Sequence, residues 1–234
     1  MLANLPNPGT GRLHTCEELA GIFGYNPGVV NRILLENGVS HHPSPRVRQG
    51  DLPENERAFF LGLAQGDLQI GKVHWGRESY VSVGTESLRG PRRALLERTI
   101  GTWGELHTRV KGIRIYVGSP GFDFMLEPSV NSNFMDAKSR FAPFLLGMMA
   151  IGLSEIGNRL SSENGDLLER IHRRFPRHFG SSLGCYAVER RGTSVITVQN
   201  PGEVFGGLIQ VESVKKLPFL PDLAKLPLVQ SGSV

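Results

Sequence analysis

A short segment of this chain occurs twice, and the repetition limits the possible folds more than any other feature. Residues 59–62 and 144–147 share a Phe-x-Leu-Gly pattern at an offset of 85. Three further echoes follow in the same order, at offsets of 72, 80 and 81: Leu95 to Arg98 with Leu167 to Arg170, Lys111-Gly112 with Arg191-Gly192, and Pro120-Gly121 with Pro201-Gly202. This order indicates that an ancestral unit was duplicated.

Each copy begins with a segment typical of a closely packed helix. Residues 57–66 and 141–152 mix large apolar side chains with glycine and alanine, so another backbone can approach. In both copies a basic helix and two strands follow. The first copy also contains residues 68–87, whose polar and apolar residues roughly alternate, which predicts a hairpin with one exposed face. The fall in offset from 85 to 72 predicts that the second copy lacks most of this hairpin.

The N-terminal region predicts a small two-helix module. Thr15 and Glu18 have capping-box spacing, and Pro27 suits the first turn of a second helix. The predicted apolar faces consist of Leu19, Ala20, Phe23, Val29, Val30, Ile33 and Leu34. The positions of Ala20, Gly24 and Val30 resemble the helix-turn-helix of DNA regulators. That resemblance implies that the second helix enters the major groove, where the DNA contacts would be Asn26, Asn31 and Arg32. The alternative is a helical hairpin that only packs on the rest of the chain.

Composition divides the chain into five predicted segments. Residues 1–40 form the module, and residues 41–53, rich in proline, serine and charge, form a linker. Residues 54–128 are the first repeat and residues 129–214 the truncated second repeat. Residues 215–234 are predicted to be an extended C-terminal tail, either packed on the core or loose.

Residues 60–68, FLGLAQGDL, resemble the LAGLIDADG motif of homing endonucleases, with Gly62, Leu63, Gly66 and Asp67 at matching places. Residues 113–126, IRIYVGSPGFDFML, resemble that family's last strand and the aromatic helix after it. The resemblance spans about residues 54 to 212. It implies an α+β fold: a pseudo-duplicated αββαββα core with a truncated second repeat, here preceded by the helix-turn-helix module. The combination also resembles bacterial sporulation regulators, in which a related fold has lost cleavage and the helix-turn-helix lies at the other end.

The resemblance also implies a particular chemistry. In the family, two motif helices each end in a carboxylate, and the pair holds a divalent metal against the scissile phosphates. Asp67 matches the first carboxylate, as a catalytic residue and a ligand for Mg²⁺, which prefers carboxylate oxygens. Gly152 stands at the second place and cannot bind metal. Glu155 would replace it only if the second helix runs longer. The motif departs from the family at Leu68, which replaces a glycine, and at Gln65, where an acid is common.

A saddle of strands in the major groove is the DNA-binding surface that the resemblance implies. Strand alternation predicts these DNA-facing residues: Gln69, Lys72, His74, Arg77 and Ser79 around the first turn, and Arg109, Lys111 and Arg114 in the second hairpin. Positive charge is concentrated nearby, with seven cations against three anions in residues 86–115 and six against three in residues 166–191. Solvated faces of ordinary helices remain the alternative explanation.

Charge and cysteine content narrow the class of partner. The chain has 26 Lys and Arg against 22 Asp and Glu, a formal net charge of +4, and 20 of its cations are arginine. This bias favours phosphate partners, although a GC-rich genome would produce it too. Cys16 and Cys185 have no closely spaced partner, and no apolar run has the length of a bilayer span. We therefore expect a soluble, intracellular protein without a membrane partner.

Three functions are consistent with these features. The first is sequence-specific binding of double-stranded DNA, of homing-endonuclease type, with cleavage weakened or lost. The second is an active Mg²⁺-dependent DNA endonuclease, and the third is an RNA-binding intron maturase, which needs no carboxylate pair. A chain that carries both halves is expected to act as a monomer, although a homodimer would bring two copies of Asp67 together.

Overall fold

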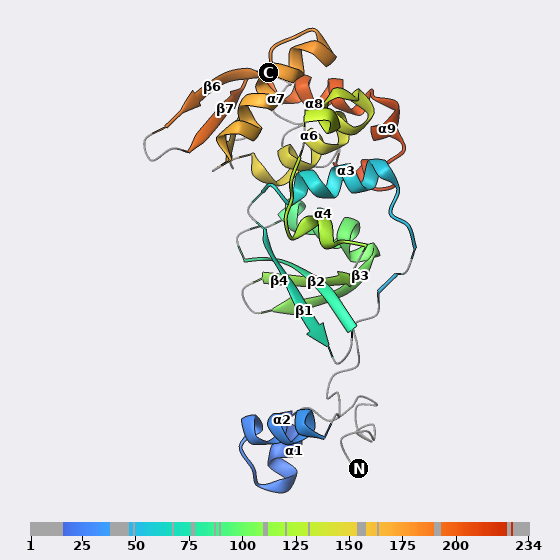
Figure 1. The fold of residues 1–234 in the computed structure, drawn as a ribbon, viewed down its shortest axis with the longest axis vertical. Helices are drawn as coiled ribbons and strands as arrows, with labels where there is room; N and C mark the ends of the chain where they lie inside the picture. The colour runs from blue at the N-terminus through green and yellow to red at the C-terminus, as the bar shows by residue number, and fades with distance from the viewer. Residues whose placement is uncertain are drawn as a thin grey trace.

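The computed structural model describes residues 16–37, 47–48, 50–66, 68–75, 78–86, 88, 90–109, 112–119, 121–130, 132–153, 158–162, 164–189, 193–223 and 226. Two related units, each built on an antiparallel sheet, follow a pair of short helices (Figure 1). The fold is α+β, as the repeat predicts. Within the residues described, no helix is long and apolar enough to cross a bilayer.

The first unit has the element order expected for one complete repeat. Helix α3 (Glu54–Leu63) precedes a hairpin, a second helix and a second hairpin. These are β1 (Gln69–Trp75), β2 (Glu78–Thr85), α4 (Gly90–Thr99), the 3-10 turn η2 (Ile100–Thr102), β3 (Gly104–Arg109), β4 (Gly112–Gly118) and the 3-10 turn η3 (Asp123–Met125). The antiparallel strands have the order β1-β2-β4-β3, so β4 joins the two hairpins.

The second unit repeats this order in shortened form. Its elements are α5 (Ser132–Asp136), α6 (Lys138–Gly152), β5 (Arg159–Ser162), α7 (Gly165–Phe179), β6 (Gly184–Val188), β7 (Ser194–Val198) and α8 (Pro201–Ile209). The strand order β5-β7-β6 places β5 where the first sheet has β2. Among the residues described in this unit, no strand corresponds to β1, and a four-residue strand is what remains of the hairpin. This shortening agrees with the fall in the repeat offset from 85 to 72.

Two glycines show that the duplication extends to the sheets. A Cβ on Gly104, at the start of β3, would lie 2.1 Å from the carbonyl oxygen of Tyr116 in β4. A Cβ on Gly184, at the start of β6, would lie 2.0 Å from the carbonyl oxygen of Thr197 in β7. The offsets between these pairs, 80 and 81, are those of the sequence echoes. In each unit, the strand that begins with this glycine therefore lies against its neighbouring strand in the same way.

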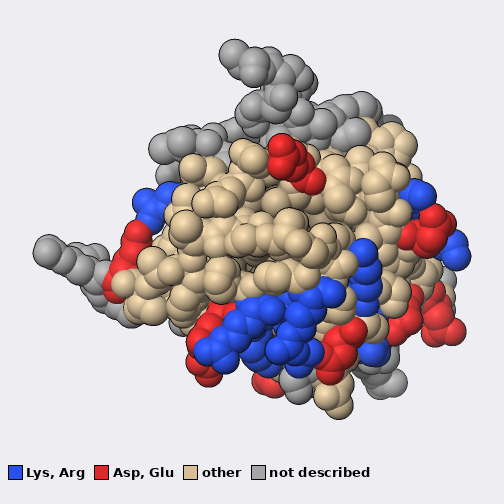
Figure 2. Space-filling view, turned by 90° about the horizontal axis from the view of Figure 1, so that it is seen from above, with Lys and Arg blue, Asp and Glu red and all other residues tan. Residues whose placement is uncertain are grey.

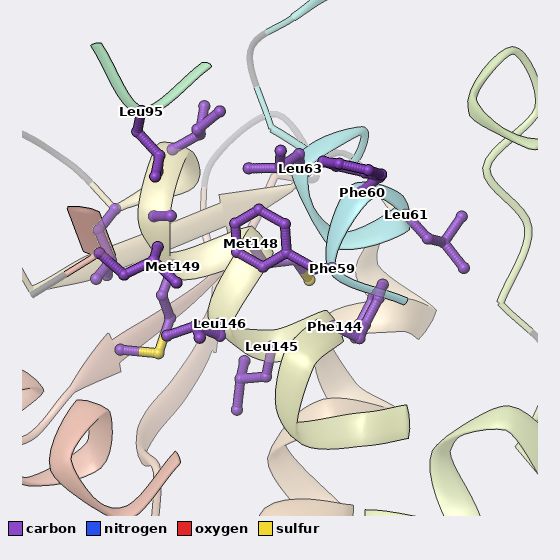
Figure 3. Close-up of a cluster of buried hydrophobic side chains, with 14 of the residues drawn as sticks. Phe59, Phe60, Leu61, Leu63, Leu95, Phe144, Leu145, Leu146, Met148 and Met149 are labelled. Carbon is purple, nitrogen blue, oxygen red and sulfur yellow. The ribbon is translucent and has the colours of Figure 1, made fainter. Parts of the chain in front are cut away.

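Helices α3 and α6 form the seam between the units and pack through reciprocal glycines. A Cβ on Gly62 would lie 2.0 Å from the carbonyl oxygen of Phe144, and one on Gly147 would lie 2.2 Å from that of Phe59. Both relations follow the offset of 85, so a pseudo-twofold axis passes between the helices. Figure 3 shows the large side chains around this contact, including Phe59, Phe60, Leu63, Phe144, Leu145 and Met148.

The C-terminal segment packs back across the seam. After α9 (Glu212–Lys215) and before α10 (Leu220–Leu223), the ring of Phe219 lies 4.6 Å from that of Phe59 and is 4% exposed. In α10, Asp222 forms an ion pair with Arg98 of α4. The described part of the predicted tail contains a short helix and is not fully extended, but it packs on the core, which was one of the two predicted alternatives, and it ties the second unit to the first.

A buried carboxylate fixes the place where the chain enters the first unit. Glu56 accepts a hydrogen bond from Nε1 of Trp103 at 3.2 Å. The guanidinium carbon of Arg48 lies 4.5 Å from the centre of the Trp103 ring, and the Arg48 backbone N–H donates to the Trp103 carbonyl oxygen at 3.1 Å. Burial raises the pKa of Glu56, and the Trp103 hydrogen bond and the Arg48 charge partly oppose this. The same three residues thus join the entering chain to both α3 and the first sheet.

The N-terminal module has a small core of its own. Helices α1 (Cys16–Phe23) and α2 (Pro27–Glu36) bury Leu19, Ala20 and Val30, and Leu34 packs against them. Gly24 has a φ of +70°, which supports the predicted turn.

Part of the predicted apolar face of the module is wrong. Phe23, Val29 and Ile33 are 53%, 41% and 44% exposed. Two short helices bury one narrow stripe each, so the flanking apolar residues stay in solvent. Thr15, the predicted cap of α1, lies outside the described residues.

Candidate nucleic-acid interface

The register of the first sheet places two predicted DNA contacts on its helix side. Lys72 pairs with Val81, and His74 pairs with Ser79. Val81 belongs to the core beneath the helices, and directly paired residues of an antiparallel sheet share a face. In agreement, Nζ of Lys72 lies 3.8 Å from Oδ2 of Asp123 in η3. Both side chains therefore point toward the layer that contains the helices.

The other face of this sheet, which we call the open face, carries Gln69 and Arg114. Gln69 pairs with Gly84, and Gly84 pairs with Arg114, so the three positions lie on one side. The prediction that Lys72 and His74 share a face with Gln69 is wrong. Side chains alternate along a strand, and positions separated by an odd number of residues point in opposite directions.

Arg114 lies across a glycine on the open face. Its Nε is 3.3 Å from the point where a Cβ on Gly84 would stand. No carboxylate of the described residues forms an ion pair with Arg114. A side chain at residue 84 would crowd this arginine, so the glycine leaves its guanidinium room to lie against the sheet. An arginine in this arrangement is available to a phosphate or to a guanine edge.

Aromatic and polar side chains accompany Arg114 on this face. Nε2 of His107 lies 3.1 Å from Oε1 of Glu105, and the His107 ring meets the Tyr116 ring edge-on at 5.0 Å. Tyr80 and Ser82 point the same way, because they alternate with Val81. Tyr80, Ser82 and Tyr116 are 3%, 5% and 6% exposed, so they support this face from within. His107 pairs with Arg114 and is not among the predicted contacts.

Three predicted contacts cannot be placed in this surface. Arg77 and Lys111 lie outside the described residues, as does the side chain of Arg109. The backbone of Arg109 occupies a strand position paired with Gly112.

The second sheet offers a smaller surface. On its equivalent face, Arg159 pairs with Thr197, and Thr197 pairs with Cys185. Arg159 forms an ion pair with Glu189, so its charge is balanced within the protein. The described surface of the two units is therefore unequal in both size and charge.

The arginines of α7 are also partly neutralised. Figure 2 shows the end of the molecule that carries α7 and α8, where Lys and Arg side chains gather next to acidic ones. Arg173 pairs with Glu169, and Arg174 pairs with Asp136 of α5. The predicted concentration of positive charge is present in this helix, but much of it is balanced locally.

The structure gives different environments to the three predicted contacts of the module. Oδ1 of Asn26 accepts a hydrogen bond from the backbone N–H of Gly28 at 2.8 Å, so Asn26 caps α2. Oδ1 of Asn31 lies 3.9 Å from Sγ of Cys16. Arg32 is exposed and has no ion-pair partner among the described residues. Of the three, Arg32 is the most available to an external group.

The ends of the two motif helices converge, but the predicted carboxylates are not described. A Cβ on Gly66 would lie 3.0 Å from Cγ2 of Ile151, its counterpart at the offset of 85. Asp67 and Glu155 lie outside the described residues. The helix extension that Glu155 requires is absent, because α6 ends at Gly152 and the following residue forms a β-bridge.

The described residues contain no group of three or more His, Cys, Asp or Glu suited to a metal ion. Gln65, at the place where the motif often has an acid, donates from Nε2 to the carbonyl oxygen of Pro128 at 2.8 Å. This side chain therefore holds a loop. At Gln65 and at Gly152 the motif therefore has no carboxylate.

The molecule is thus a duplicated αββαββ protein, with an open face on its larger sheet and an additional N-terminal module. Comparison with solved structures finds homing endonucleases, in agreement with the family that the motif resembles. Neither a scan of protein-family models nor a search of curated proteins finds a match.

Three solved structures illustrate how distant the likeness is. Variants of the homing endonuclease I-DmoI share 15% identity, with 68% of this chain and 98% of that chain covered and a TM-score of 0.45. The homing endonuclease I-WcaI bound to its DNA recognition sequence shares 11% identity, with 83% and 95% covered and a TM-score of 0.44. Full-length DUF199/WhiA from Thermatoga maritima shares 11% identity, with 80% and 63% covered and a TM-score of 0.43.

Proposed function

We propose that this chain binds double-stranded DNA in a sequence-specific manner, as a protein of homing-endonuclease type whose cleavage is weakened or lost. The observation that carries the proposal is Arg114, which lies across Gly84 on an open antiparallel face. A strand ribbon fits the major groove, and an arginine there pairs with two acceptors of guanine. The neighbouring His107, which is half-buried and pairs with Arg114, supplies a further donor or acceptor.

Weakened cleavage follows from the second motif helix. It ends at Gly152, the counterpart of Asp67 at the offset of 85, and glycine has no oxygen side chain to hold Mg²⁺. The backbone turns away directly after this residue, because Leu153 bridges to Leu160 of β5. At Gly152, the second repeat therefore lacks the carboxylate that metal-assisted hydrolysis would need at this place.

A pair of substitutions on opposite faces of one sheet tests DNA binding. The protein is incubated with a pooled duplex library in Mg²⁺, and retained sequences and their affinities are measured. Arg114→Ala should reduce affinity for the selected sequence about 5- to 150-fold, because it removes a base or phosphate contact worth about 1–3 kcal/mol. Lys72→Ala removes the same charge as Arg114→Ala, but from the helix side of the sheet, and should have little effect on DNA affinity. Equal losses in both variants would contradict the use of the open face.

Active cleavage is the second candidate, because the convergence of Gly66 and Ile151 brings the two helix ends together just before Asp67. In this case Asp67 would hold Mg²⁺, which would supply Lewis-acid stabilisation at a scissile phosphate. Nicking of the selected duplex that disappears in Asp67→Asn would favour this candidate over the first. Preference for structured RNA over every duplex would instead favour an intron maturase.

A further inference from the structure

We propose that the N-terminal module extends the DNA site on the flank of the first repeat and not on that of the second. The recognised site would then be bipartite, with an outer block read by α2 and an inner block read by the open face. This inference rests on the proposed DNA-binding function and adds the arrangement of the site.

The tether of the module starts from a fixed point on the first repeat. Residues 38–46 connect the module to Val47 and Arg48, which are docked on the first sheet. Val47 Cγ2 lies 3.4 Å from the point where a Cβ on Gly118 would stand, at the end of β4. Arg48 is held on Trp103 by its backbone and by its guanidinium. The module is therefore anchored beside the first sheet and not beside the second.

The length of the tether limits the reach of the module. Ten residue steps separate Asn37 from Val47, so the C-terminal end of the module cannot lie further than about 36 Å from its anchor. That distance is about one turn of B-DNA. A compact core of this size measures about 40 Å across, so even a fully extended tether favours the flank of the first repeat over the far flank of the second. In Figure 1, α1 and α2 lie beyond the first sheet.

In this arrangement the module adds to the inequality of the two repeats. The described second sheet has three strands, and its Arg159 is paired with Glu189. The module has its own core and presents Arg32 to solvent. An added reading element on the side of the larger sheet lengthens the site in one direction, so it increases the asymmetry and does not compensate for the smaller repeat.

Two native cysteines allow the orientation to be mapped in the full-length chain. Cys16 lies in α1, and exposed Cys185 lies on the open side of the second sheet. An iron chelate that cleaves DNA is attached to the remaining thiol in Cys16→Ser and in Cys185→Ser, after both variants are shown to bind the selected duplex. We expect the reagent at Cys16 and the reagent at Cys185 to cut at opposite ends of the site. Cuts at the same end would overturn the inference.

The substitution Arg32→Ala gives a second, independent measurement. Sequences selected by Arg32→Ala should show no base preference in the outer block and should keep the preference in the inner block. Sequences selected by Arg114→Ala should keep the outer preference and lose the inner one. Insertion of five base pairs between the blocks should lower the affinity of the wild type about tenfold and leave that of Arg32→Ala unchanged. An unchanged selection by Arg32→Ala would contradict the inference. If the wild type selects no duplex at all, it is the proposed function that fails.

Discussion

At the scale of single residues, the two seam glycines leave no room for a side chain. We predict that Gly147→Ala destabilises the fold by at least about 2 kcal/mol, because backbone atoms of α3 leave no room for a methyl group. The new Cβ would lie 2.2 Å from the carbonyl oxygen of Phe59 and 3.0 Å from the backbone nitrogen of Leu63. Urea unfolding followed by circular dichroism measures the change.

A glycine in another helix provides the matched control. Gly206 of α8 has no atom within 4 Å of an added Cβ. Gly206→Ala should therefore leave stability unchanged or raise it by up to about 1 kcal/mol, since alanine favours helix. Similar losses for Gly147→Ala and Gly206→Ala would show that helix propensity, and not close packing, decides the effect.

A second prediction at this scale concerns Glu56 and pH. Burial raises its pKa in the folded state, so the native protein binds this proton more tightly than the unfolded chain does. The resulting stabilisation is complete below the unfolded pKa, about 4.5, and is lost as the pH rises through the folded pKa. Glu56→Gln keeps an oxygen acceptor for Trp103 but does not titrate. Wild type should therefore lose stability relative to Glu56→Gln between pH 4 and pH 7.

The measurement is the free energy of unfolding of both proteins at several pH values. A difference that stays constant across this range, or that favours wild type as the pH rises, would contradict the raised pKa.

At the scale of elements, the C-terminal segment is part of the core. The ring of Phe219 is 4% exposed and packs on Phe59, directly beside the seam. We predict that Phe219→Ala costs about 3–5 kcal/mol, because it leaves a cavity between the segment and α3. Val188→Ala, at a strand residue that is 63% exposed, should cost less than about 0.5 kcal/mol. Thermal unfolding of the two variants compares them, and equal midpoints would show that the segment contributes no packing.

The seam between α3 and α6 could be predicted from the repeat, because close helix packing leaves a glycine at the same place in both copies. The echo of Gly62 by Gly147 is therefore enough to locate the contact. The loss of the β1 equivalent is likewise visible in the offsets. In contrast, β5 is four residues long and mostly polar, so its residues, RLSS, carry no clear strand signal.

The interface was harder to predict than the fold. Lys72 and His74 have the residue types of DNA contacts, but strand register, which depends on pairing with β2, places them on the helix side. Phe23 and Ile33 have the spacing of a buried helix face, yet the module is too small to cover them. The first error could have been avoided from the sequence, because Gln69 and Lys72 are an odd number of residues apart and cannot share a face. The second error arises because burial depends on what lies opposite a residue, and local pattern does not contain that information.

At the scale of the whole molecule, the described structure combines a seam that is symmetric with surfaces that are not. The glycine contacts of α3 and α6 are reciprocal, whereas the sheets differ in strand number and in the pairing of their arginines. Symmetric packing and asymmetric surface are compatible, because the seam needs only two similar helices while each outer face can change separately. A duplex bound by such a molecule would have unequal halves.

Salt dependence tests this arrangement across the whole surface. Each phosphate neutralised lowers the slope of log affinity against log salt by about 0.9, so about four contacts would reduce affinity about a hundredfold between 50 and 200 mM. Arg32→Ala should make the slope less steep by up to about 0.9, because one cation fewer then displaces counterions from the duplex. Lys72→Ala should leave the slope unchanged, since that ammonium lies on the helix side near Asp123. Fluorescence anisotropy with the selected duplex measures all three proteins. A flat response in wild type would exclude a phosphate-binding surface, and equal slope changes in both variants would indicate a general effect of net charge.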